Sequence, residues 1–320
     1  MIDLWLPALL VLVGFAGLIW SADKFVGGSA ALARSYGVSK LIIGLTIVAL
    51  GTSAPEVLVS ISASLQGKGD LAIGNALGSN LANIGLVLGV TALIASLPVQ
   101  NHLLKTEMPV LLLITALAGW FLYDAQLSQA EGLTLLLALP CAMAIIIWSK
   151  RHHPEEVDDE IPDMTRGRAL FWFAFGLLAL IISSDLLVRG ASELALAFGV
   201  SPLIIGLTVV AVGTSLPELA ASVASALKGH HDIAIGNVIG SNLFNLLAVM
   251  SLPGIIAPIT MEAEVFSRDF VAMAGITALL ALALFASGII HRNNGGARLG
   301  KTMGIVFLLV YAGYYFVLLG

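Results

Sequence analysis

The chain contains one stretch twice, and this duplication limits the folds open to it. Residues 41–56 read LIIGLTIVALGTSAPE and residues 203–218 read LIIGLTVVAVGTSLPE, with thirteen of sixteen positions identical at an offset of 162. The same offset, without a gap, maps AIGNALGSNLAN at 72–83 onto AIGNVIGSNLFN at 234–245. Any fold for this chain therefore has to hold two closely similar structural units.

Each copy places a proline and a glutamate inside a long apolar run. Within a helix, Pro55 removes one backbone hydrogen bond and clashes with the preceding turn. The carboxylates of Glu56 and Glu218 are costly in a bilayer unless something neutralises them. Because both penalties occur in both copies, we interpret the two GTSxPE segments as the halves of a binding site.

The composition indicates an integral membrane protein. Of 320 residues, 58% are hydrophobic and only 11% are charged, whereas soluble proteins carry about 25% charged residues. The sequence has no basic patch of the kind that binds nucleic acid, so no nucleic-acid partner is expected. The composition predicts that the lipid bilayer surrounds the protein. The single cysteine, Cys141, excludes an internal disulfide.

Ten segments are long and apolar enough to span a membrane, which takes about 20 residues. They are residues 4–33, 40–66, 70–96, 106–123, 127–149, 168–197, 202–228, 232–257, 266–289 and 299–319. A polar, acidic connector at 150–167 separates a first repeat, 1–149, from a second, 168–320. Because each repeat holds five helices, an odd number, the two repeats must have opposite orientations. We therefore predict an all-α membrane protein with ten transmembrane helices in two inverted five-helix repeats.

The loop charges predict the orientation, since Lys and Arg gather in cytoplasmic loops. In the loops predicted to lie outside, the only basic residues are Lys68 and Arg268. We therefore predict that both termini face outside and that the connector is cytoplasmic. The loops predicted to be cytoplasmic carry eleven basic residues: Arg34, Lys40, Lys105, Lys150, Arg151, Arg166, Arg168, Lys228, Arg292, Arg298 and Lys301.

Hard oxygen ligands gather around each proline. Thr52 and Ser53 lie four and three residues before Glu56 and share a helix face with it, and Pro55 loosens the carbonyls from Ala49 to Thr52. Such oxygen-only sets suit Ca²⁺ or Na⁺ rather than zinc or copper. Ca²⁺ takes 6–8 oxygens, so both copies would be needed. The second copy supplies Ala211, Thr214, Ser215 and Glu218, and polar residues repeat at i+4 as Asn75, Ser79 and Asn83 and as Asn237, Ser241 and Asn245.

The paired GTSxPE segments, each followed by GNxxGSN, resemble the alpha repeats of the sodium/calcium exchanger family, within the calcium/cation antiporter superfamily. The chain is most similar to its compact ten-helix prokaryotic members. The resemblance implies exchange of Ca²⁺ for Na⁺ by alternating access, no cofactor besides the transported ions, and a bacterial cytoplasmic (inner) membrane. It also implies that the first and sixth helices slide across the core as a gate. We expect a monomer.

The resemblance also implies which residues bind the ions. Glu56 and Glu218 would be shared central ligands. The flanking ligands would be Thr52, Ser53, Ser79, Asn83, Thr214, Ser215, Ser241 and Asn245, with the carbonyls of Ala49 and Ala211.

One position departs from the family pattern and leaves alternatives open. Well-studied members carry Asp at the position of Asn245, so this site holds two carboxylates rather than three. Coupling to H⁺ or to K⁺ therefore stays open beside Na⁺. From other classes, a cation channel or a membrane enzyme could use Glu56 and Glu218. Against an enzyme, the sequence shows no nucleophile–base arrangement, metal triad or phosphate loop.

Overall fold

The computed structural model describes residues 4–100, 102–151, 164–200, 209, 211–290 and 298–319. The part it describes is helical apart from two pairs of two-residue strands, and η marks π-helical segments. The first repeat holds α1 (Trp5–Tyr36), α2 (Lys40–Ile43), η1 (Gly44–Val48), α3 (Ala49–Thr52), α4 (Ala54–Leu65), α5 (Gly69–Ala82), η2 (Asn83–Leu88), α6 (Gly89–Ile94), β1 (Leu97–Pro98), η3 (Leu103–Glu107), α7 (Met108–Leu122), β2 (Gln126–Leu127) and α8 (Gln129–Arg151).

The described elements of the second repeat follow the same order, and the counterparts of α2 and η1 fall almost wholly outside the described residues. Its helices and strands are α9 (Arg166–Ala197), α11 (Ala211–Thr214), α12 (Leu216–Leu227), α13 (His231–Phe244), η5 (Asn245–Val249), α14 (Ser251–Ile256), β3 (Ile259–Thr260), η6 (Val265–Phe270), α15 (Val271–Ile290), β4 (Arg298–Leu299) and α16 (Lys301–Leu319).

The predicted segments agree with these helices to within three residues at every described end. Eight described helices are long and apolar enough to cross a membrane, and a ninth span is the broken pair Lys40–Thr52 and Ala54–Leu65, bent by 44°. The predicted segment 202–228 lies partly outside the described residues, as does most of the connector 150–167. The count of ten helices and the division into domains therefore stay predictions.

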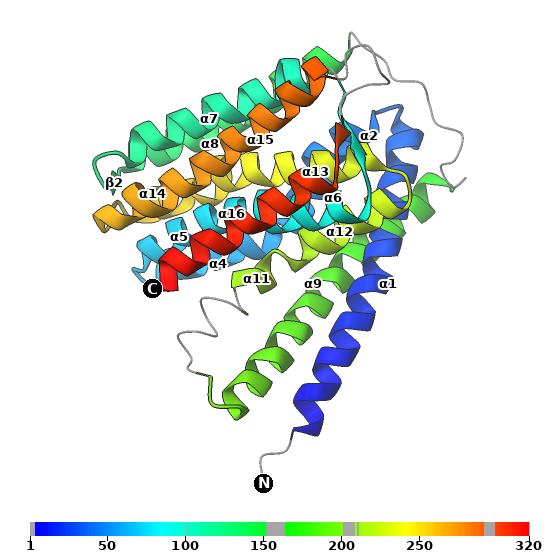
Figure 1. The fold of residues 1–320 in the computed structure, drawn as a ribbon, viewed down its shortest axis with the longest axis horizontal. Helices are drawn as coiled ribbons and strands as arrows, with labels where there is room; N and C mark the ends of the chain where they lie inside the picture. The colour runs from blue at the N-terminus through cyan, green and yellow to red at the C-terminus, as the bar shows by residue number, and fades with distance from the viewer. Residues whose placement is uncertain are drawn as a thin grey trace.

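Two long helices, α1 and α9, run side by side as a pair (Figure 1). Their close contacts are antiparallel. A Cβ placed on Gly14 would lie 2.6 Å from the nitrogen of Leu187, and one on Gly28 would lie 2.5 Å from the nitrogen of Phe173. A helix carrying any larger residue at these positions could not approach its neighbour so closely.

The same contacts recur with the two helices exchanged. A Cβ on Gly176 would lie 2.6 Å from the nitrogen of Phe25, and one on Gly190 would lie 2.6 Å from the carbonyl oxygen of Pro7. Gly14 and Gly176 are equivalent at the repeat offset, and so are Gly28 and Gly190. The glycines of the α1–α9 contact are therefore related by approximate two-fold symmetry.

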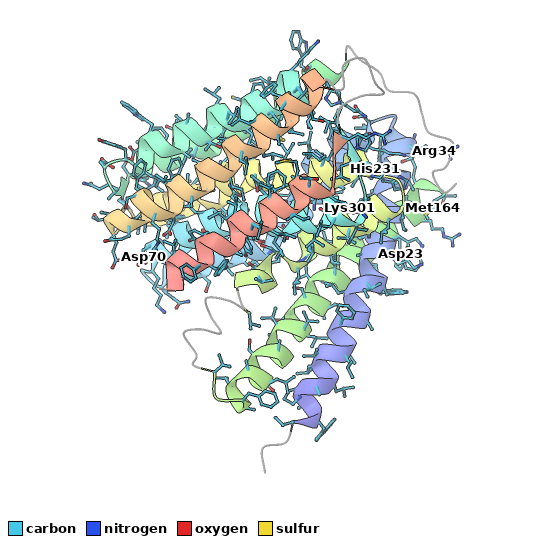
Figure 2. All side chains as sticks on the ribbon, in the orientation of Figure 1. Asp23, Arg34, Asp70, Met164, His231 and Lys301 are labelled. Carbon is cyan, nitrogen blue, oxygen red and sulfur yellow. The ribbon has the colours of Figure 1, made fainter. Side chains whose placement is uncertain are left out.

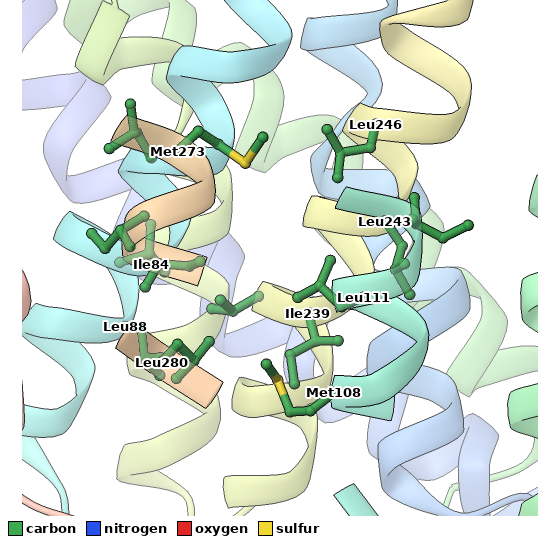
Figure 3. Close-up of a cluster of buried hydrophobic side chains, with 14 of the residues drawn as sticks. Ile84, Leu88, Met108, Leu111, Ile239, Leu243, Leu246, Met273 and Leu280 are labelled. Atoms are coloured by element: carbon green, nitrogen blue, oxygen red, sulfur yellow. The ribbon is translucent and has the colours of Figure 1, made fainter. Parts of the chain in front are cut away.

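The remaining helices surround the buried middle spans, Gly69–Ile94 and His231–Ile256. Figure 3 shows part of this core, where Ile84 of η2, Leu111 of α7, Ile239 and Leu243 of α13 and Leu280 of α15 pack together. These side chains are fully or almost fully buried. The core thus fixes the two helices that carry the GSN segments.

Short strands join loops of the two repeats at opposite ends. Leu97 of β1 pairs with Leu299 of β4, and Leu127 of β2 pairs with Ile259 of β3, both antiparallel. The first pair joins two loops that the charges predict to be cytoplasmic, and the second joins two predicted to be external. Figure 2 shows Arg34, Met164 and His231 towards one end of the molecule and Asp70 towards the other.

Candidate ion-binding site

The site begins with a break in each GTSxPE helix. Helix α3 ends at Thr52, Ser53 has φ −81° and ψ 6°, and α4 starts with Pro55 in its first turn. In the second copy α11 ends at Thr214, Ser215 has φ −88° and ψ 3°, and α12 starts with Pro217 in its first turn. The break expected from Pro55 is therefore confirmed, and the second copy repeats it at Ser215.

The two GSN helices also change form at the site. Helix α5 gives way to the π-helical η2 at Asn83, and α13 gives way to η5 at Asn245. π-Helical turns lie frequently at functional sites because the wider turn disturbs the regular pattern of carbonyls. Each of these two asparagines thus stands at the first position of an irregular turn.

The structure brings nearly all of the predicted site residues into the protein interior. Glu56 is 1% exposed and Glu218 is fully buried, and the two carboxylates lie close enough to interact electrostatically. Thr214 is half-buried, and the side chain of Ala211 lies outside the described part. The other buried members of the predicted set are Ala49, Thr52, Ser53, Ser79, Asn83, Ser215, Ser241 and Asn245.

Contacts between the repeats place the two glutamates in one cluster. The hydroxyl of Ser53 donates to Oε1 of Glu218 at 3.1 Å, and the hydroxyl of Ser79 donates to Oε1 of Glu56 at 3.4 Å. The Asn83 amide donates to Oδ1 of Asn242 at 3.1 Å. Side chains from both copies therefore meet at one place, where the broken helices approach the GSN helices.

Several oxygens in this cluster are buried and have no hydrogen-bond partner among the described residues. A buried oxygen without a partner costs about 1–3 kcal/mol. Such a set of oxygens, with two carboxylates, has the chemistry of a ligand shell for a hard cation. The oxygens are Oε2 of Glu56, Oε2 of Glu218, the hydroxyls of Ser215 and Ser241, and Oδ1 of Asn83 and Asn245.

The cluster contains no third acidic, histidine or cysteine side chain. Over the described ranges, no group of three or more such residues is placed to hold a metal ion. Asn245, where a third carboxylate could stand, is fully buried and neither of its side-chain polar atoms has a partner there. The arrangement thus supplies two formal negative charges and several neutral oxygens.

Comparison with known proteins identifies the family. The model of the sodium/calcium exchanger protein family matches residues 6–148 and again residues 168–320. The chain belongs to the sodium/calcium exchanger family. It is therefore an integral membrane protein of a family of ion exchangers rather than of enzymes.

Relatives in this family match over most of their length. CaxA of Alkalimonas amylolytica is 44% identical over 96% of this chain and 97% of its own. The inner membrane protein YrbG of Escherichia coli is 39% identical over 87% and 88%. The solved structure of the sodium-calcium exchanger NCX_Mj, soaked with Na⁺ and Sr²⁺, is similar with a TM-score of 0.81, at 32% identity over 96% of each chain.

Sequence reasoning missed two groups of buried polar residues. Glu107 is fully buried beside His102, 3.1 Å from its Nδ1, and Asp269 is 6% exposed and bound by Arg268. Asn242 accepts the amide of Asn83, and its backbone oxygen accepts the amide of Asn80 at 3.2 Å. The repeat offset relates Glu107 to Asp269 and Asn80 to Asn242, and this offset was the signal that could have found them.

Proposed function

We propose that this protein is a secondary antiporter that exchanges Ca²⁺ for Na⁺ by alternating access. The observation that carries the proposal is the cluster of buried oxygens around Glu56 and Glu218, drawn from both copies. Two carboxylates supply the charge that a divalent ion requires, and the hydroxyl, amide and carbonyl oxygens complete the 6–8 ligands that Ca²⁺ takes. The proposed ligands are the twelve residues named from the sequence, with Glu56 and Glu218 shared between ions.

The number of carboxylates also sets the charge moved per cycle. With Asn at position 245, the two glutamates neutralise either one Ca²⁺ or two Na⁺. A buried site tolerates uncompensated charge poorly. We therefore infer an exchange of two Na⁺ for one Ca²⁺, with no net charge carried.

Uptake of ⁴⁵Ca²⁺ into proteoliposomes tests this function. An outward Na⁺ gradient is expected to drive Ca²⁺ uptake, because each cycle returns Na⁺ through the same site. An imposed membrane potential is expected to leave the initial rate unchanged. Uptake that follows the Ca²⁺ gradient alone would indicate a channel, and uptake driven only by an H⁺ or K⁺ gradient would contradict Na⁺ coupling.

We further propose that both termini face the outside of the cytoplasmic membrane. The loop charges favour this orientation. The two strand pairs agree with the grouping of the loops into two sides, because each pair joins loops predicted to lie on one side. The approximate two-fold relation of the α1 and α9 glycines similarly supports two inverted repeats of five helices. Cysteines introduced at positions 2 and 320 are expected to react with an impermeant thiol reagent from outside whole cells. Reaction of either one only in inverted vesicles would contradict this orientation.

A further inference from the structure

One fully buried asparagine at the ion site, Asn237, is not among the predicted ligands. Asn237 lies in α13, within the most buried span of the protein. Its side chain contacts the broken helix of each repeat, Thr52 of α3 and Glu218 and Ser222 of α12. Three helices are therefore joined at one amide.

Both ends of this amide are bonded. The hydroxyl of Thr52 donates to Oδ1 of Asn237 at 3.0 Å. Nδ2 of Asn237 donates to the hydroxyl of Ser222 at 3.0 Å and to the backbone oxygen of Glu218 at 3.3 Å. Because Ser222 and Glu218 take the donor end, they fix the orientation of the amide and keep Oδ1 turned towards Thr52.

The hydrogen bond from Thr52 to Asn237 determines which part of the Thr52 hydroxyl can face a cation. A hydroxyl has one proton and two lone pairs. When the hydroxyl donates its hydrogen bond to Asn237, its lone pairs stay available as acceptors and no hydrogen points towards a bound ion. Two further acceptors lie within reach of this hydroxyl, the carbonyl of Ala49 at 3.4 Å and the carboxylate of Glu218, and both are themselves proposed ligands.

We propose that Asn237 is a positioning residue for ion binding, which accepts the hydrogen bond of the Thr52 hydroxyl and thereby leaves the lone pairs of that oxygen free to bind a cation. This inference rests on the proposed function, since it assigns Thr52 to the ion site. It adds to that function a residue that need not touch the ion. The physical role is orientation of a ligand by a hydrogen bond behind it.

The other copy contains the same residues, but the donor end of the amide is held differently among the described residues. Asn75, the equivalent of Asn237, is half-buried, and its Nδ2 has no partner among the residues the structure describes. Ser60, the equivalent of Ser222, donates instead to the carbonyl of Val249 at 2.8 Å. Among the described residues, Nδ2 of Asn75 thus lacks the two hydrogen bonds that hold Nδ2 of Asn237. Asn75 therefore provides a matched control.

A double-mutant cycle tests the proposal. Thr52→Val and Asn237→Ala are each expected to raise the KM for Ca²⁺ about tenfold, equivalent to about 1.4 kcal/mol. If Asn237 acts through Thr52, adding Asn237→Ala to Thr52→Val should raise KM by no more than about a further twofold. Asn75→Ala should change KM by less than about twofold. Purified variants are compared by gel filtration to show that they fold.

Ser222→Ala gives a milder variant should Asn237→Ala fail to fold. It removes one of the two bonds that orient the amide, so we expect about a threefold rise in KM that disappears in the Thr52→Val background. Three results would overturn the proposal. The Thr52 and Asn237 changes could raise KM independently, Asn75→Ala could raise KM as much as Asn237→Ala, or Thr52→Val could leave KM unchanged. A wild-type protein without gradient-driven Ca²⁺ uptake would instead contradict the proposed function.

Discussion

Replacing either Glu56 or Glu218 with Gln is expected to reduce Ca²⁺ exchange to the background of empty vesicles. Each change keeps the size of the side chain but removes one of two formal charges at a site with no third acidic ligand. A divalent ion would then sit in the protein interior with one charge uncompensated, which is strongly unfavourable. Gradient-driven ⁴⁵Ca²⁺ uptake by purified protein in vesicles measures the effect.

Loss of activity in these variants should not result from misfolding. A charged residue at the centre of a membrane helix costs about 2.5–3.5 kcal/mol on insertion scales, so its removal favours insertion. Glu193→Gln makes the same chemical change on the exposed face of α9 and should leave uptake at the wild-type rate. Uptake near the wild-type rate in Glu56→Gln or Glu218→Gln would show that the cluster is not the transport site.

The second large effect is expected from Gly176→Leu, at the contact between α9 and α1. A Cβ at this position already lies 2.6 Å from the nitrogen and 2.8 Å from the Cα of Phe25, and backbone atoms cannot move aside by changing rotamer. The two helices would have to separate, and overpacking of this kind costs about 1–3 kcal/mol or more. If the pair moves as a gate, exchange should fall at least tenfold.

Gly275→Leu is the control for this change. Gly275 is exposed on α15, and a Cβ there meets nothing within 4 Å. The same added side chain should therefore leave exchange unchanged. Binding of ⁴⁵Ca²⁺ to detergent-solubilised Gly176→Leu should persist, because the change lies outside the ligand cluster. Wild-type exchange by Gly176→Leu would contradict a gating role for this contact.

The sequence predicted those features of the fold that one helix determines by itself. Hydrophobic length located the helices. Pro55 predicted a break in its helix, because a missing donor weakens the helix wherever it occurs, and the structure has a bend of 44° there. The spacing of Thr52, Ser53 and Glu56 predicted a shared polar face, and all three are buried together. The assignment of these residues to ions stays a proposal.

Features that depend on how the two copies meet could not be predicted in this way. Asn75 and Asn237 stand in nearly identical sequences, so their local patterns predict identical contacts. Only Asn237 has its donor end fixed by both Ser222 and the backbone of Glu218. The π-helical turns at Asn83 and Asn245 likewise replace α-helix inside continuous apolar runs that carry no proline there. The difference between Asn75 and Asn237 therefore arises from tertiary packing rather than from local preference, whereas the π-helical turns begin at equivalent positions of the two copies.

The buried oxygens without partners connect ion supply to folding. A buried oxygen that has no hydrogen-bond partner costs about 1–3 kcal/mol, and whole proteins are stable by only about 5–15 kcal/mol. Under the proposed function, a cation at 100 times its dissociation constant returns about 2.7 kcal/mol to the folded state. The transported ions would then also stabilise the folded protein. A chelator would lower its melting temperature, and the protein would be less stable in a membrane whose surroundings lack both Ca²⁺ and Na⁺.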